Sequence, residues 1–189
     1  MVYRLAHAIA IRVKDANPDD TEPIDVLTFG FILMLNLLVT WGLLIGFAIA
    51  LQEIILIMAT GVSFMIIRIF TGGAHFSTAI ACTLVSVGFI VGVSFLPAAP
   101  IIYTILAFVC VLSYAPYYEE DQVVHSQAWE RKKKLVGVLW IIIASSVALL
   151  FDFHALVHGV FLQGVLLTPI GTRLILTLNK WINNEEATK

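Results

Sequence analysis

The longest stretch without Asp, Glu, Lys or Arg runs from Ile69 to Tyr118, and it constrains the fold more than any other feature. A helix that crosses about 30 Å of hydrocarbon needs roughly 20 apolar residues, so this stretch is too long for one span. Gly72-Gly73 interrupts its start and Pro97-Ala98-Ala99-Pro100 its middle, which is typical of loops and turns. The stretch therefore predicts a loop, a span over about 76–96 and another over about 101–115.

The composition supports a membrane protein along the whole chain. Hydrophobic residues make up 60% and charged residues 13%, whereas soluble domains have roughly 45–50% and about 25%. The net charge is −2 and the mean hydropathy +0.96, so no nucleic-acid partner is expected. The two cysteines, Cys82 and Cys110, lie in apolar runs without metal-ligand spacing, and we expect neither a metal ion nor a cofactor.

The remaining apolar runs complete an all-α, polytopic integral membrane protein of about six spans. Each run is long enough, with its flanks, to cross the bilayer, and Asp152 to His154 would form a tight turn between the last two. Pro169 and Gly171 would lie inside the sixth span. The four additional spans are predicted at Val26 to Gln52, Ile54 to Ile67, Leu135 to Phe151 and Ala155 to about Leu176.

The basic residues indicate the orientation, because in this arrangement they all fall on one side of the bilayer. The three opposite connections, around Glu53, at Pro97 to Pro100 and around Asp152, contain none. By the positive-inside rule both termini face the cytoplasm. The eleven residues are Arg4, Arg12, Lys14, Arg68, Arg131, Lys132, Lys133, Lys134, Arg173, Lys180 and Lys189.

We interpret the chain as a single membrane domain. Residues 1–16 carry apolar side chains on one helical face and charges on another, which favours a helix lying in the cytoplasmic interface, although a solvated arm is the alternative. The other predicted segments are spans one to four at 26–115, a charged cytoplasmic loop at 116–134, spans five and six at 135–176, and a cytoplasmic tail at 177–189.

The side chains that could take part in catalysis are concentrated between Arg68 and Cys82. Polar groups at membrane depth mark functional candidates. On one continuous helix His75 and Cys82 would share a face about 10.5 Å apart along the axis, too far for proton transfer. A working pair therefore requires the helix to begin after His75. Gly72-Gly73 would let the chain fold back, and Ser77 or Thr78 would cap the new helix. The alternatives are a packed thiol and an interfacial histidine.

The order and spacing of Arg68, Gly73, His75 and Cys82 resemble the catalytic segment of the accessory gene regulator B (AgrB) family, membrane cysteine endopeptidases of bacterial quorum sensing. Tyr114-Ala115-Pro116, the length and the hydropathy are also similar to the family. The segment after Pro116, up to Trp129, departs from its pattern. The resemblance implies a multi-pass protein of the bacterial cell membrane, possessing a cytoplasmic active site and forming a homodimer.

The resemblance also implies the chemistry. Cys82 would be the nucleophile and His75 its general base, with Arg68 and Gly73 as supporting residues. Gly72 and Ser77 join this supporting set because of the fold-back and the helix cap described above. The substrate would be an AgrD-like propeptide. Its acidic C-terminal tail would be released as a thioester forms on Cys82, and an internal cysteine or serine would then close a thiolactone or lactone ring to give an autoinducing peptide.

The basic run Arg131, Lys132, Lys133 and Lys134 has two compatible interpretations: an anchor to anionic lipid and a weak docking site for the acidic propeptide tail. A metal-dependent protease would need Glu119, Glu120, His154 and His158 together, yet the predicted topology separates them across the bilayer. A small transporter or a peptide-binding scaffold without enzymatic activity is the alternative of a different class.

Overall fold

The computed structural model describes residues 2–117 and 126–187, and the regular elements of this part of the chain are α-helices joined by short segments. Within these residues the only β-bridge is an isolated one between Gly72 and Tyr117. The predicted all-α class is therefore confirmed. The helices are α1 (Val2–Ala16), α2 (Ile24–Ala50), α3 (Ile54–Thr71), α4 (Ala79–Ser94), α5 (Pro100–Tyr114), α6 (Gln127–Phe151), α7 (Ala155–Leu167) and α8 (Pro169–Ala187).

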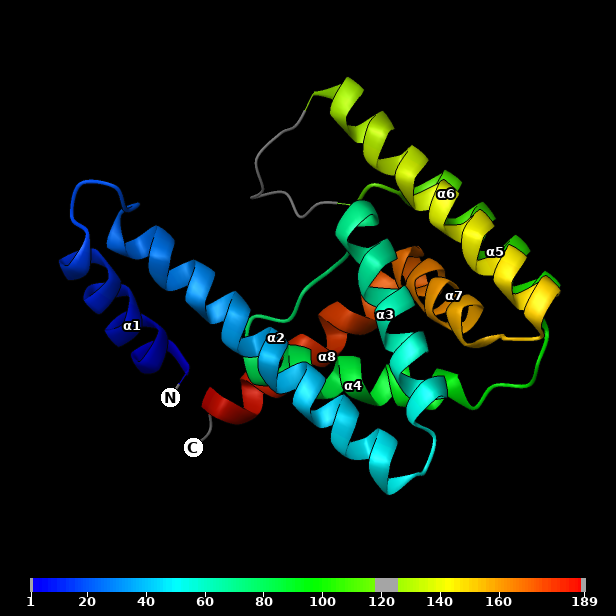
Figure 1. The fold of residues 1–189 in the computed structure, drawn as a ribbon, viewed down its shortest axis with the longest axis horizontal. Helices are drawn as coiled ribbons and strands as arrows, with labels where there is room; N and C mark the ends of the chain where they lie inside the picture. The colour runs from blue at the N-terminus through cyan, green and yellow to red at the C-terminus, as the bar shows by residue number, and fades with distance from the viewer. Residues whose placement is uncertain (1, 118–125, 188–189) are drawn as a thin grey trace.

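Helix α3 lies at the centre, with α7 against it, the α5–α6 pair on one side and α2 on the other (Figure 1). The closest approach is at Gly159 of α7. A Cβ atom there would lie 2.5 Å from the Thr60 carbonyl oxygen and 2.7 Å from the Phe64 amide nitrogen. Small residues let helix backbones approach in this way in membrane proteins. The glycine therefore sets the distance between α3 and α7.

Three of the described helices, α2, α3 and α6, are long and apolar enough to cross a membrane, and the bent pair α7 and α8 makes up to four. Helices α4 and α5 are apolar but shorter. The described residues thus form an all-helical structure with several helices that could span a membrane, which is consistent with a membrane protein. The six predicted spans and the orientation of the termini stay predictions.

The prediction of a single helix from Ala155 to about Leu176 is wrong, while the span itself stays a prediction. Helix α7 ends at Leu167, and α8 departs from it at 77°. The Thr168 hydroxyl accepts a hydrogen bond from the Gly171 amide, which caps the new helix, and Pro169 has the position after the cap at which proline starts helices. Pro169 and Gly171 therefore lie in the first turn of α8 and not in the middle of one continuous helix.

The charged loop predicted to end at Lys134 is also wrong at that end. The side chain of Ser126 accepts a hydrogen bond from the Trp129 amide and caps α6, which begins at Gln127. The four basic residues therefore lie on the first turns of a helix. Residues 118–125 of the predicted loop lie outside the described part of the chain.

Helix α1 forms as predicted, and its small residues Ala6 and Ala10 are buried against α2. The His7 ring nitrogen Nδ1 lies 3.2 Å from the Thr28 hydroxyl of α2 and adds a polar contact. The location of α1 in the membrane interface stays a prediction.

Candidate active site

The candidate site begins where α3 ends. Gly72 and Gly73 have φ angles of 71° and 142°, a region that favours glycine because a Cβ atom is strained there. A Cβ atom on Gly72 would also collide with the Tyr117 carbonyl oxygen. Tyr117 pairs with this turn: its amide donates to the Thr71 carbonyl at 2.9 Å, and the Gly73 amide donates to the Tyr117 carbonyl at 3.2 Å. The segment after α5 thus supports the end of α3.

Arg68 folds back over this turn from the last part of α3. Its Nη2 donates to the Ala74 carbonyl at 2.7 Å and its Nη1 to Oε1 of Gln163 at 3.3 Å. The guanidinium also lies 5.6 Å from the centroid of the Phe64 ring, within the range of a cation–π interaction. A Cβ atom on Gly73 would lie 2.8 Å from Nη1. Glycine at this position therefore leaves room for the charge.

Cys82 enters the same place from α4. The predicted break between His75 and Cys82 is confirmed, because α4 begins at Ala79 and the Thr78 hydroxyl accepts from the Ala81 amide as its cap. Cys82 lies one turn into this helix and is partly buried, and its amide donates to the Thr78 carbonyl at 3.1 Å. The cap at Thr78 therefore sets where Cys82 lies relative to the turn at the end of α3.

Arg68 and Cys82 line one small cavity of about 10 Å³, together with Phe64 and Phe89. That is about the space of one water molecule. The two residues lie close enough to interact electrostatically when the thiol is ionised. The cavity walls are largely aromatic and aliphatic, so a charge interaction inside them is screened less than in water.

His75 lies on the segment between α3 and α4 and has an exposed side chain. Ser77, two residues later, is attached to α8: Oδ1 of Asn179 accepts hydrogen bonds from its amide and its hydroxyl, each at 3.0 Å. The structure thus brings Arg68 and Cys82 to one cavity and Gly73 beside the guanidinium. His75 and Ser77 lie on the segment that leads into α4.

Two residues that support this site are absent from the sequence-based set. Gln163 is completely buried on α7 and donates to the Thr71 hydroxyl at 2.9 Å and the Gly72 carbonyl at 2.7 Å. Asn179 is the second. The rule that a polar side chain in an apolar helix marks function points to Gln163, because its neighbours on α7 are apolar or glycine.

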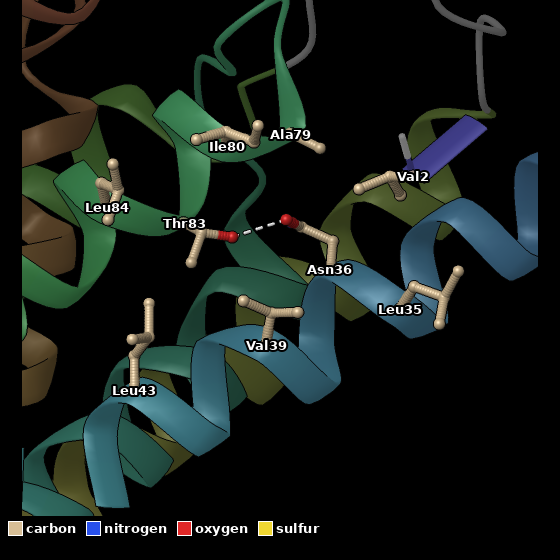
Figure 2. Close-up of a pocket in the computed structure, with 9 residues that line it drawn as sticks. All are labelled: Val2, Leu35, Asn36, Val39, Leu43, Ala79, Ile80, Thr83 and Leu84. Atoms are coloured by element: carbon tan, nitrogen blue, oxygen red, sulfur yellow. Dashed lines mark hydrogen bonds between the residues drawn. The ribbon is translucent and has the colours of Figure 1, made fainter. Parts of the chain in front are cut away.

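A second pocket lies on another side of α4, against α2, and has a different character (Figure 2). Its walls are mostly aliphatic, and its polar contact is the Thr83 hydroxyl, which donates to Oδ1 of Asn36 at 2.5 Å. The Thr83 and Thr40 hydroxyls are 3.2 Å apart. These contacts attach α4 to α2 directly beside Cys82.

The basic residues at the start of α6 divide into two groups. The Lys133 ammonium lies 3.9 Å from the centroid of the Trp129 ring, and the Lys134 ammonium donates to the Leu112 carbonyl at the end of α5 at 2.5 Å. Arg131 and Lys132 are exposed. The second pair is therefore the part of the run that is accessible to lipid or peptide.

For the metal-protease alternative, Glu119 and Glu120 lie outside the described residues. His154 lies 3.0 Å from the Asp152 carboxylate, and His158 is buried against the Tyr103 ring. Within residues 2–117 and 126–187, no group of three His, Cys, Asp or Glu side chains could hold a metal ion.

Comparison with known proteins identifies the family of the chain. The family model for accessory gene regulator B matches residues 6–168, which is most of the chain. The chain belongs to the AgrB family. It is also 43% identical over 186 residues to an AgrB-like protein of Halalkalibacterium halodurans, covering 96% of this chain and 94% of that one. No solved structure matches the chain.

Membership of the AgrB family implies a part in the agr quorum-sensing system and an AgrD-like propeptide as partner. It also suggests a peptidase role in processing that propeptide. The matched region contains the turn at Gly72-Gly73, Cys82 and Gln163. The resemblance seen in the sequence is thus confirmed at the level of the family.

Proposed function

We propose that this protein is a membrane cysteine endopeptidase that removes the C-terminal tail from an AgrD-like propeptide. The observation that carries the proposal is the common cavity of Arg68 and Cys82, formed because the chain doubles back at Gly72-Gly73 and α4 restarts at Ala79. A thiol at the start of a helix and beside a guanidinium has the surroundings of a reactive cysteine.

In the proposed reaction the Cys82 thiolate attacks the carbonyl carbon of the scissile peptide bond. The carbon–nitrogen bond breaks, His75 protonates the leaving amine, and the tail departs with a new amino terminus, leaving the acyl group as a thioester on the sulfur. A cysteine or serine of the substrate then attacks the thioester carbonyl, closes the ring and releases the thiolate. The Arg68 guanidinium would stabilise the negative charge on the sulfur and on the tetrahedral oxygen.

The proposal includes the surroundings of the reaction. The site faces the cytoplasm, because Arg68 and the basic start of α6 lie toward one end of the bundle and basic residues favour that side. Arg131 and Lys132 attract anionic lipid and the acidic tail of the propeptide, and the protein acts as a homodimer in the bacterial cell membrane.

The test is the processing of a co-expressed propeptide by Cys82→Ser, with Cys110→Ser as the matched control. Cys110 is partly buried in α5, outside the Arg68 cavity. We expect Cys82→Ser to abolish release of the tail and Cys110→Ser to retain it. Mass spectrometry should also detect a propeptide acyl group on the wild-type thiol. Cleavage by Cys82→Ser at the wild-type rate would contradict the proposal and favour a transporter or scaffold.

A further inference from the structure

Gln163 is the one side chain that connects Arg68 to the glycine turn in the described structure. Its Oε1 accepts from Nη1 of Arg68 at 3.3 Å, while its Nε2 donates to the Thr71 hydroxyl at 2.9 Å and to the Gly72 carbonyl at 2.7 Å. One amide therefore contacts the cation and the backbone that turns toward Cys82. Its side chain has no exposed surface, so water does not replace these bonds.

The position of Gln163 follows from helix packing. Gly159, one turn earlier on α7, lets that helix approach α3 at Thr60 and Phe64. The next turn of α7 then lies beside the end of α3, where the carbonyl groups have no partner within the helix. The Gly72 carbonyl belongs to the turn after that end and is satisfied from α7. Leaving this buried carbonyl without a hydrogen-bond donor would lower the stability of the fold.

The geometry points to Gln163 as a positioning residue that holds the Arg68 guanidinium toward Cys82. This inference rests on the proposed function. Arg68 has acceptors on two sides, the Ala74 carbonyl and the Gln163 amide, and these fix the plane of the guanidinium along the cavity wall. Without the amide, the acceptor that Arg68 retains among the described residues is the Ala74 carbonyl, and its long side chain regains freedom to turn toward the membrane boundary.

The consequence is a change in the reactivity of Cys82. A guanidinium held beside the sulfur stabilises negative charge on it, and the sulfur reacts with electrophiles as an anion. When the guanidinium moves away, this stabilisation is lost and the reaction slows. The rate of alkylation by a small uncharged reagent measures the effect without any substrate, and so does not depend on how a propeptide binds.

The experiment uses the full-length protein with Cys110→Ser, so that Cys82 is the only cysteine, and follows alkylation by N-ethylmaleimide from pH 6 to 10. Gln163→Leu removes all three hydrogen bonds. Gln163→Glu retains an oxygen that accepts from Arg68, but the new carboxylate pairs with the charge of the guanidinium. It also loses the donor to the Gly72 carbonyl. We expect both to slow alkylation at pH 7 by about tenfold, which corresponds to about 1.4 kcal/mol, and both to converge with wild type at high pH.

Val165→Ala on the exposed side of the same helix is the control and should react at the wild-type rate. Gln163→Leu in an Arg68→Lys background should add little further loss, because residues that act through one another are not additive. In propeptide cleavage, kcat should fall with an unchanged KM. If Gln163→Leu does not fold, Gln163→Glu decides the question.

A folded Gln163 variant with the wild-type alkylation profile would overturn the inference, whatever its melting temperature. The two proposals fail separately. Slow alkylation in the variants, combined with no cleavage of any propeptide by wild type, would retain the positioning role and remove the peptidase. Cleavage that requires Cys82 but is indifferent to Gln163 would retain the peptidase and remove the positioning role.

Discussion

Gly159 should be the position of α7 most sensitive to a single added methyl group. In Gly159→Ala the new Cβ atom would lie 2.5 Å from the Thr60 carbonyl oxygen, 2.7 Å from the Phe64 amide nitrogen and 2.8 Å from Cβ of Ser63. All three atoms are fixed to the backbone of α3, so none can rotate away. The two helices must separate to accommodate the methyl group, and every contact between them is weakened.

The magnitude follows from two opposing effects. Overpacking of a tight core lowers the free energy of unfolding by about 1–3 kcal/mol. Because the neighbouring atoms are rigid, we expect a cost of about 3 kcal/mol here. Replacing glycine by alanine in a helix contributes about 1 kcal/mol in the other direction. We therefore expect Gly159→Ala to lower the free energy of unfolding by about 2 kcal/mol. Because Gln163 moves outward with α7, propeptide processing should fall as well.

The matched control is Gly92→Ala in α4, where the added atom would meet nothing within 4 Å. It should be neutral or more stable by about 1 kcal/mol. Unfolding with sodium dodecyl sulfate in mixed micelles, followed by circular dichroism, compares the two variants directly. Equal shifts in both, or a more stable Gly159→Ala, would refute the close approach of α3 and α7.

Three further predictions concern the site. Gly73→Ala should reduce processing at least tenfold, because its φ of 142° and its 2.8 Å approach to the guanidinium together cost about 1–3 kcal/mol; Gly88→Ala, whose added atom meets nothing within 4 Å, should retain activity. Asn179→Leu removes the acceptor for the turn before α4 and should increase hydrogen exchange there, whereas Asn179→Asp retains the acceptor and should not. Replacing Arg131 and Lys132 by glutamine should weaken the binding of an acidic tail peptide, and should also make that binding less dependent on salt. Unchanged binding would contradict docking of the tail at these two residues.

The sequence was sufficient for the helical class and for the break at the candidate site. Its apolar runs predict helices of the right type because every backbone group in a bilayer must be satisfied within the chain. The paired glycines and the capping threonine are local signals, and α4 begins directly after them. These features depend on residues close together in the chain, which is why a single sequence contains them.

The bend after α7 was not predicted because hydropathy does not distinguish a continuing span from a helix that leaves the bundle. The run from Ala155 to Leu176 is largely apolar on both sides of Thr168, with Arg173 as its one charged residue. What separates the two helices is the hydroxyl of Thr168 acting as a cap and the proline that follows it. A threonine followed by proline can also occur at a kink inside one continuous helix. Packing decides whether the helix kinks or ends there.

The support for the glycine turn was beyond the sequence for a different reason. Tyr117 and Gln163 are distant from Gly72 along the chain, and both contact this turn only because α7 packs against α3 and α5 packs against α7. A motif that contains Arg68, Gly73 and Cys82 therefore does not define the site alone. Changes in the segment after α5 or in α7 should alter the reactivity of Cys82 even when the whole stretch from Arg68 to Cys82 is retained, because the turn takes its hydrogen bonds from those two segments.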